Sequence, residues 1–288
     1  MEVKPKRNCL RISVGAVIAL LAAGAGADPI VADNFTLASG TGVATVNNTE
    51  SSGVGTYSTI QGANGMSVTT VSGFGDGNVL SLANGTQTYY RQFDGATTLT
   101  LNSLLEHQTL RLAFDVRFNG SFAGADNFSF GFIDDSPANS VLYANVDLSS
   151  SGGTLSELRY RTGSFNMSDA AGSTIFGSPF TEPSTVSGQA YLLQLDITKQ
   201  TDGGFLVEYF RDGLLAGSTL QGTSSNFTTT AGGLAISGIA FRHSQTPNVV
   251  TYLDNVTVAV IPEPLTGIFF LGGGAMLAYR RRWYRVLT

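Results

Sequence analysis

Apolar and polar residues alternate one by one along several stretches of this 288-residue chain. The clearest stretch is 110–118, where Leu, Phe and Val recur at every second position and Arg111, Asp115 and Arg117 lie between them. Side chains of an extended strand point to opposite faces in turn, so a period of two is typical of a strand with one buried face. The same alternation predicts further strands over residues 128–132, 193–197, 205–209 and 256–260.

Short glycine-containing turns separate these strands. Asp212 and Gly213, preceded by Arg211, join residues 206–210 to 214–219 as a predicted hairpin, because Asp-Gly is a favoured two-residue turn. About fourteen candidate strands lie between residues 28 and 260, without the fixed-period repeat that builds a propeller. We therefore predict an all-β fold, a two-sheet antiparallel sandwich of jelly-roll type, with loops over residues 149–154 and 170–187.

The N-terminus has the pattern of a secretory signal peptide. Four cations accompany an apolar run over residues 12–23, and Ala25 and Ala27 form a small-residue cleavage site. We expect a signal helix within residues 1–27, passage through the Sec translocon, and cleavage by signal peptidase before Asp28; an uncleaved signal anchor is the alternative. The single cysteine, Cys9, would leave with this segment, so the mature domain would have no disulfide and would depend on its core.

The last 28 residues, 261–288, form a second distinctive segment. Its parts are, in order, a triplet, an apolar run and a basic cluster: Pro262, Glu263 and Pro264, then residues 265–279, then Arg280, Arg281 and Arg282. The prolines oppose an earlier helix start, and the apolar run can form a transmembrane helix with its arginines on the cytoplasmic side. Its helical length of ~22 Å is less than a hydrocarbon core about 30 Å thick, which suits a transient anchor.

These three parts, in this order at the C-terminal end, resemble the PEP-CTERM sorting signal. In that family the tail is recognised and cleaved by an exosortase, a membrane transpeptidase of Gram-negative bacteria that make extracellular polysaccharide. The resemblance covers residues 261–285. It implies a transient inner-membrane stage followed by the cell surface or extracellular matrix; an ordinary single-pass anchor with a chance triplet is the alternative.

Removal of both terminal segments changes the charge of the remaining domain. Residues 28–260 contain eight Lys and Arg against 19 Asp and Glu, a formal charge of −11. Nucleic acid is excluded as a partner, since phosphate binding requires clustered cations. Anionic lipid surfaces are disfavoured for the same reason, whereas cations and neutral glycans are compatible with this charge, which also serves solubility.

The domain itself is similar to concanavalin-like and laminin-G-like jelly rolls and to carbohydrate-binding modules of that shape. The residues that carry the resemblance are the opening Asp33-Asn34-Phe35 and residues 111–118, 128–133, 209–213 and 252–256. The resemblance implies a structural Ca²⁺ held by Asp33 and Asp254, with backbone oxygens completing the shell of hard ligands. The alternative for each aspartate is a turn residue that accepts hydrogen bonds from backbone amides. Ca²⁺ would be the only cofactor.

Catalytic motifs are missing from the domain sequence. Glycoside hydrolysis requires two carboxylates about 5–9 Å apart, and the carboxylate motifs of hydrolases with this fold do not occur. His107 and His243 show no metal-ligand spacing, and no Gly-x-Ser-x-Gly elbow is present. We therefore expect no enzyme activity. The isolated acidic residues are Glu106, Glu157, Glu182 and Glu208, with Asp134 and Asp135 adjacent in a predicted turn.

Aromatic side chains could stack on sugar rings. The candidates are Tyr89, Tyr90, Tyr143 and Tyr160 with Arg161, and cross-strand packing is the alternative role for each. The favoured hypothesis is an exported, exosortase-processed surface or matrix protein. Its sandwich would bind or scaffold extracellular polysaccharide without catalysis. A secreted glycan-active hydrolase or lyase and a purely structural exoprotein are the two alternatives.

Overall fold

The computed structural model describes one compact unit of the chain, Asp28–Ile261, in part. The described residues are 29–33, 35, 45–48, 55–61, 66–82, 87–93, 98–122, 126–134, 140–148, 156–161, 173–175, 179–181, 183–221, 235–244 and 249–262. The predicted signal helix, the cleavage residues Ala25 and Ala27 and the predicted helix 265–279 lie outside them, as do all predicted sorting residues except Pro262. Within the described residues, no helix combines the length and apolar character that a membrane crossing requires.

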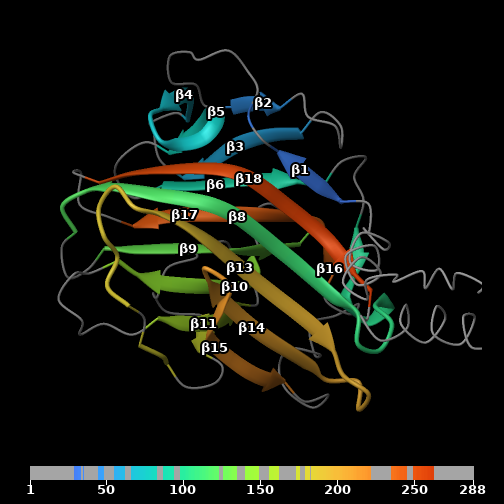
Figure 1. The fold of residues 1–288 in the computed structure, drawn as a ribbon. Helices are drawn as coiled ribbons and strands as arrows, with labels where there is room; N and C mark the ends of the chain where they lie inside the picture. The colour runs from blue at the N-terminus through green and yellow to red at the C-terminus, as the bar shows by residue number, and fades with distance from the viewer. Residues whose placement is uncertain are drawn as a thin grey trace, which may run out of the picture. The chain divides into compact units, whose positions relative to one another are not determined.

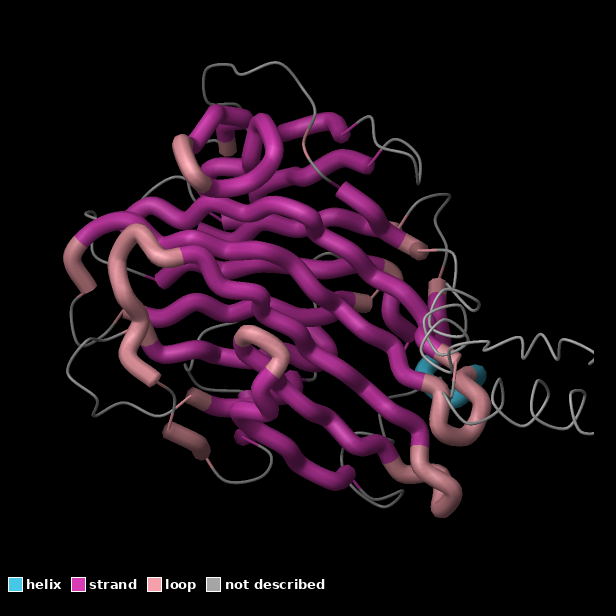
Figure 2. The backbone as a smooth tube through the Cα atoms, in the orientation of Figure 1, coloured by secondary structure: helices cyan, strands magenta, loops and turns pink. Residues whose placement is uncertain are grey.

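The strands form two eight-stranded antiparallel sheets, here named sheets A and B (Figures 1 and 2). Sheet A has the order β15 (Leu214–Gln221), β14 (Phe205–Arg211), β13 (Ala190–Lys199), β8 (Thr109–Gly120), β18 (Val249–Ile261), β5 (Phe74–Leu82) and β4 (Ser67–Val71), and β1 (Val31–Asp33) also pairs with β18. Sheet B has the order β12 (Ser173–Ile175), β11 (Glu157–Arg161), β10 (Ser140–Asp147), β9 (Asn127–Ile133), β17 (Gly238–Ser244), β6 (Gln87–Gln92), β3 (Gly55–Gln61) and β2 (Thr45–Asn48).

The two sheets pack face to face as a sandwich. In Figure 1, β8, β13 and β18 cross in front of β9, β10 and β17. A separate pair, β7 (Leu99–Thr100) with β16 (Ala235–Ile236), lies next to the short 3-10 turn η2 (Leu101–Ser103) in sequence. The chain passes directly from one sheet to the other after β1, β3, β5, β8, β12 and β17, and by way of β7 and β16 after β6 and β15. Repeated exchange between two sheets is typical of a jelly roll. The prediction of an all-β, two-sheet antiparallel sandwich is therefore confirmed.

Alternating burial along the central strand β8 explains how the sheets hold together. From residue 109 to residue 118 its odd-numbered residues are half-exposed and its even-numbered residues are buried. One face of the strand therefore belongs to the core. Phe114, at its middle, meets Phe130 of β9 edge-to-face at 4.9 Å between ring centroids, and Phe241 of β17 at 5.1 Å. Edge-to-face pairs add about 0.5–1.5 kcal/mol beyond the burial of their area. Sheet A is thereby joined to the middle of sheet B.

The predicted hairpin is present between β14 and β15. Asp212 and Gly213 form its two-residue loop and both have positive φ, 52° and 76°. A loop with two residues of positive φ is the type I′ turn, whose twist matches that of the flanking strands. The Asp212 backbone N–H donates to the Leu192 carbonyl, and the Asp212 carboxylate accepts from the Leu192 N–H. The loop is therefore tied to the next strand of the sheet.

Two sequence predictions are corrected by the structure. The alternation at residues 128–132 predicts one buried face for β9, but all residues from Phe128 to Ile133 are buried. A Cβ added at Gly131 would lie 2.1 Å from the Leu142 carbonyl oxygen, so only glycine fits there. The predicted loop 170–187 also contains the strand β12, because three residues pair with β11. Both features depend on neighbouring strands and have no local signal.

A buried ion pair links the first strand to the opposite sheet. Asp33 of β1 accepts a hydrogen bond from the Tyr57 hydroxyl at 2.7 Å and lies 3.1 Å from the Arg91 Nε. Both charged side chains have no solvent exposure, and Arg91 also lies over the Tyr57 ring. Tyr57 and Arg91 belong to paired strands of sheet B, whereas β1 pairs in sheet A. The opposite charges of Asp33 and Arg91 stabilise one another at a place that water does not reach.

We predict that removal of the Asp33 charge destabilises the domain severely. Asp33→Asn should lower the free energy of unfolding by about 3–5 kcal/mol, because it removes the negative charge that lies 3.1 Å from the buried Arg91 guanidinium. Tyr57→Phe, which removes one hydrogen bond, should cost about 1 kcal/mol. Urea denaturation monitored by far-UV circular dichroism measures the free energy of unfolding of both variants. A loss for Asp33→Asn no larger than that for Tyr57→Phe would show that the pair contributes little.

Candidate functional site

The aspartates of the predicted calcium site lie in different surroundings. Asp33 faces Arg91 and Tyr57, so the protein's own cation occupies the place that the resemblance assigns to Ca²⁺. Asp254 is buried in β18, and its carboxylate accepts a hydrogen bond from the Asn255 backbone N–H at 2.8 Å. No group of three or more His, Cys, Asp or Glu that could hold a metal ion occurs among the described residues. The calcium site stays a prediction.

The candidate stacking residues are mostly packed against protein. Tyr89 lies in the main core, and Tyr143 is fully buried on the outer face of sheet B. Tyr90 is half-buried beside Tyr143 and Ala240, in one cross-strand row. Tyr160 and Arg161 lie on β11, and only their backbone placement is described. The alternative role of cross-strand packing therefore holds for Tyr89 and Tyr143.

The other residues with potential chemistry are dispersed. His107 is in the turn after η2 with φ 61°, and His243 is the penultimate residue of β17. Glu106 is exposed in the same turn as His107, and Glu157 is held by Arg159 of its own strand. Asp134 directly follows β9, while Asp135 and Glu182 lie outside the described residues. Glu208 of β14 is different, because it lies in a polar row that crosses three strands.

The outer face of sheet B carries polar side chains that are shielded from solvent. Thr88, Arg242, Ser129 and Asn145 follow one another across β6, β17, β9 and β10, each at most 7% exposed. The Ser129 hydroxyl donates to the Asn145 side-chain oxygen at 2.8 Å. Buried polar groups are stable only when they are hydrogen-bonded. These four side chains on the outer face of sheet B therefore present little surface to a ligand.

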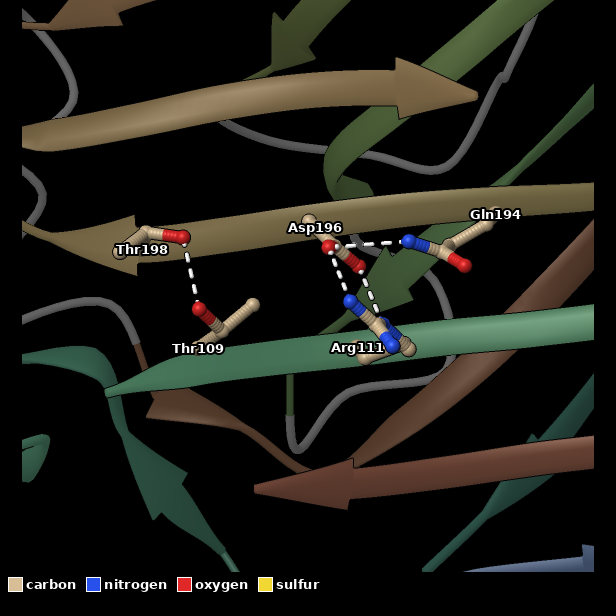
Figure 3. Close-up of polar contacts among 5 residues, drawn as sticks. All are labelled: Thr109, Arg111, Gln194, Asp196 and Thr198. Carbon is tan, nitrogen blue, oxygen red and sulfur yellow. Dashed lines mark hydrogen bonds and ion pairs between the residues drawn. The ribbon is translucent and has the colours of Figure 1, made fainter. Parts of the chain in front are cut away.

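The outer face of sheet A is open and has an ordered polar network. Arg111 of β8 donates through Nε and Nη2 to the two carboxylate oxygens of Asp196 on β13, at 2.9 and 2.8 Å (Figure 3). Gln194 donates its amide to the same carboxylate at 3.0 Å, and the Thr109 and Thr198 hydroxyls share a hydrogen bond of 2.8 Å. We name these five residues the Arg111 network. Bidentate pairs of this kind give fixed geometry as well as energy.

The register of the strands explains why these residues meet. Arg111 is directly opposite Asp196, and Thr109 is opposite Thr198, in the ladder between β8 and β13. All alternate with apolar residues that face the core, so their side chains share the outer face. The Arg111 side chain retains 37% exposure, whereas that of Asp196 retains 6%. The network therefore presents guanidinium, amide and hydroxyl groups to solvent around a covered carboxylate.

Glu208 extends the row from Arg111 and Asp196 onto β14. It is directly opposite Asp196 in the ladder and is half-buried. Burial, with repulsion from Asp196, raises the pKa of the Glu208 carboxyl above its usual value. The hydrogen bond to Asp196 raises the pKa of Arg111. Two carboxylates and one guanidinium in a row hold one negative charge in excess, and Glu208 is the group on which protonation is favoured.

Further polar residues follow β8 away from the network. Asp115 accepts a hydrogen bond from the Asn255 side-chain amide at 2.8 Å, and Arg117 donates to the Asn119 side-chain oxygen at 3.1 Å. Together with Arg111 these outward residues of β8 form what we name the β8 strip: Arg111, Asp115, Arg117 and Asn119. At about 3.4 Å per residue, the strip extends ~27 Å along the strand. It is long enough to contact several units of an extended polymer.

The sequence contains the members of this surface but does not mark them as a site. Arg111, Asp115 and Arg117 appear there only as polar spacers between core residues, and Glu208 only as an isolated acid. The signal that could have pointed to them is the opposite charge of Arg111 and Asp196 on two strongly alternating strands. Without the strand register, however, any outward pair could be chosen.

Comparisons with known proteins identify no family. No protein-family model matches the sequence, and no curated protein matches it. Several solved structures are similar in backbone arrangement. The metal-free Emp46p carbohydrate recognition domain has 9% sequence identity and a TM-score of 0.46, with 71% of this chain and 87% of that chain covered.

Two lyases have comparable scores. Alginate lyase Aly36B has 16% identity and a TM-score of 0.43 over 65% of this chain and 82% of its own. The endo-β-1,4-glucuronan lyase from the fungus Trichoderma reesei has 12% identity and a TM-score of 0.43, with 68% of this chain and 87% of the lyase chain covered. Because these TM-scores are below 0.5, no ligand or reaction is transferred from these proteins to this chain.

We predict that Glu208→Gln stabilises the domain at neutral pH. A carboxyl whose pKa is raised by folding opposes folding once it ionises, so stability falls as pH rises from the ordinary Glu pKa through the raised one. At pH 7 the free energy of unfolding of the variant should therefore exceed that of the parent, by less than about 1 kcal/mol because the site is half-exposed. Near pH 4 the two free energies of unfolding should be equal. Denaturation curves across this range measure the difference. Glu106→Gln, in an exposed turn, is the control and should show no such gain.

Proposed function

We propose that this chain is an exported surface or matrix protein whose sandwich binds extracellular glycan without catalysis. The binding surface is the open outer face of sheet A, centred on the Arg111 network and continued by the β8 strip. One observation carries the proposal: charged, amide and hydroxyl groups are held by cross-strand hydrogen bonds on a face that solvent reaches. Ligand selectivity in proteins comes from few polar groups placed in this way.

The chemistry of these groups suits polyhydroxylated ligands. A sugar hydroxyl both donates and accepts, and the network offers guanidinium and amide donors beside hydroxyl and amide acceptors. Asp196 is already held at both oxygens by Arg111, so the network is ordered before a ligand arrives. Preordered groups lose little conformational entropy on binding, which supports affinity even on an open face. Tyr252, half-buried opposite Arg117 on β18, adds an aromatic ring near the far end of the strip.

A glycan-active enzyme on the same surface is the second candidate. It is favoured by Glu208, whose raised pKa beside Asp196 is the property of a general acid. The arrangement lacks an accessible second carboxylate, however. The Asp196 side chain is 6% exposed and both its oxygens accept from Arg111, so it is poorly placed to attack a sugar or activate water. We therefore favour binding over catalysis.

Export and processing form the other half of the proposal. The N-terminal residues 1–27 direct the chain to the Sec translocon, and the C-terminal tail is removed by an exosortase-type transpeptidase. Support comes from the sequence pattern of the tail together with the place where the domain ends. The strand β18 remains paired with β8 up to Ile261, and Pro262 is exposed directly after it. The folded domain therefore ends one residue before the triplet.

We predict that Arg111→Lys and Gln194→Ala each weaken glycan binding at least tenfold, the loss of about 1.4 kcal/mol. Lysine keeps the charge but loses the bidentate fork, and alanine removes the exposed amide. A glycan array probed with the full chain selects the ligand, and titration calorimetry with that glycan measures the loss. Thr69→Ala, on the distant strand β4 of the same sheet, is the matched control and should leave binding unchanged.

The other outcomes of this experiment are equally informative. Failure to bind any neutral or uronic-acid glycan would favour the structural exoprotein. Binding that survives Arg111→Lys would place the site elsewhere. Release of reducing ends or unsaturated sugars by the parent, and its loss in Glu208→Gln, would establish the enzyme instead.

We predict that the tail variants Glu263→Ala and deletion of Arg280, Arg281 and Arg282 leave the chain in the membrane fraction of an exosortase-positive host. The triplet and the basic cluster are the parts that the processing enzyme would recognise. Cell fractionation and intact-mass measurement of the exported product test this. The parent should lack Trp283; an exported product that retains Trp283, or variants released like the parent, would contradict the sorting assignment.

A further inference from the structure

An apolar row lies beside the Arg111 network on the outer face of sheet A. Phe210 of β14 is directly opposite Gln194 of β13 and, on its other side, opposite Leu215 of β15. Leu192 is two residues from Gln194 on the same face of β13. Leu192 and Leu215 are 40% and 54% exposed, and Phe210 is half-buried. Apolar side chains on three neighbouring strands therefore border the polar groups directly.

The alternation of β14 places the Phe210 ring on the outer face. Val207, Tyr209 and Arg211 are buried on the other face of this strand, and Glu208 and Phe210 lie between them. The Phe210 ring therefore shares a face with Glu208 and is outside the layer between the two sheets. An aromatic ring next to a few fixed polar groups is the usual composition of a small-ligand site.

The two rows match the two chemical surfaces of a sugar. Neighbouring strands are ~4.8 Å apart, and successive residues on one face of a strand are ~7 Å apart. A pyranose ring has C–H groups on its faces and hydroxyls around its edge. A short oligosaccharide can therefore place one ring over Phe210 while its hydroxyls reach the Gln194 amide and the Arg111 guanidinium, which lie on the next two strands (Figure 3).

The charge of this face opposes an acidic sugar. On the described strands β8, β13 and β14 the outward charged residues are two cations and three anions: Arg111, Arg117, Asp115, Asp196 and Glu208. Arg111 donates through two nitrogens to Asp196. Arg117 also donates through two nitrogens, to the Asn119 side-chain oxygen and the Ser72 carbonyl. Both guanidiniums already have acceptors from the protein, and the carboxylates are in excess.

Glu208 responds to the same excess of negative charge. Burial, with repulsion from Asp196, raises the pKa of its carboxyl. A ligand carboxylate over Phe210 would lie two residues along β14 from Glu208 and would meet similar repulsion. A neutral hydroxyl avoids this repulsion, because it can donate a hydrogen bond to a carboxylate oxygen. The electrostatics of the site therefore favour uncharged units.

We propose that the open face of sheet A selects a neutral glycan and stacks one of its sugar rings on Phe210. This inference rests on the proposed glycan site and adds the charge of the ligand and the residue that holds its apolar face. The negative face of an aromatic ring attracts the C–H groups of a sugar face. A polyuronate carries a carboxylate on every unit, and this surface disfavours it.

The test compares ligands that differ only in charge. The full chain is probed with an array of neutral hexose oligosaccharides and of the same oligosaccharides oxidised at C6 from hydroxymethyl to carboxylate. Neutral members should be selected, and titration calorimetry at low salt should show at least tenfold weaker binding of the oxidised counterpart. The difference should narrow as salt is raised, because salt screens repulsion between exposed charges. A purely steric penalty would not respond to salt.

Variants of Phe210 test the stacking. Phe210→Ala should weaken binding of the selected neutral glycan about tenfold, and Phe210→Leu should lose most of the same affinity although it keeps an apolar side chain. Phe210→Tyr should bind like the parent, because it keeps the ring face. Leu105→Ala, at an exposed leucine after η2, is the control for loss of apolar surface and should leave binding unchanged. Far-UV circular dichroism verifies the fold of each variant.

The outcomes separate this inference from the proposed function. Selection of the oxidised glycans, or affinity that survives both Phe210→Ala and Phe210→Leu, would overturn the inference. The proposed glycan site would stand in either case if Arg111→Lys still weakens binding. A chain that binds neither member of any pair would overturn the proposed function, and this inference with it.

Discussion

The structure depends on one shared layer of side chains between its two sheets. Every second residue of β8 points into this layer, and Phe114 at its centre contacts rings from two strands of the other sheet. Burial of apolar surface at roughly 25 cal/mol per Å² is the main stabilising term in a domain with no cysteine. Because one set of alternate positions is committed to the core, only the other set can face outward and carry function.

The two outward sets differ in their access to solvent. On sheet B, Thr88, Ser129 and Arg242 are covered, and the cross-strand row beside them includes Gly131, where not even a methyl group fits. On sheet A, the Arg111 network is half-exposed and its hydrogen bonds run between strands. A polar ligand binds by replacing hydrogen bonds between protein groups and water, so the protein groups must be accessible to solvent. The open face is therefore the one that can select a polar polymer.

The buried pair of Asp33 and Arg91 has a different role. Removing two charges from water costs several kcal/mol per ion, and their attraction with the Tyr57 hydrogen bond offsets this only in good geometry. A pair of this kind adds little net stability compared with apolar packing, but it disfavours any arrangement in which β1 is displaced. It binds the first strand, which is only three residues long, to the opposite sheet. The short strand thereby gains a defined position.

Local patterns in the sequence determined the alternating strands such as β8, the β14–β15 hairpin and the class of fold, since period-two burial and the Asp212-Gly213 turn act over a few residues. The export signals, equally local in sequence, lie outside the described residues and stay predictions. Only the tertiary structure decided which outward residues meet. Arg111 and Asp196 are 85 positions apart, and Asp33 acquired an arginine partner where the sequence resemblance implied a metal ion. Strand order and register bring such residues together, and these depend on the packing of the whole core.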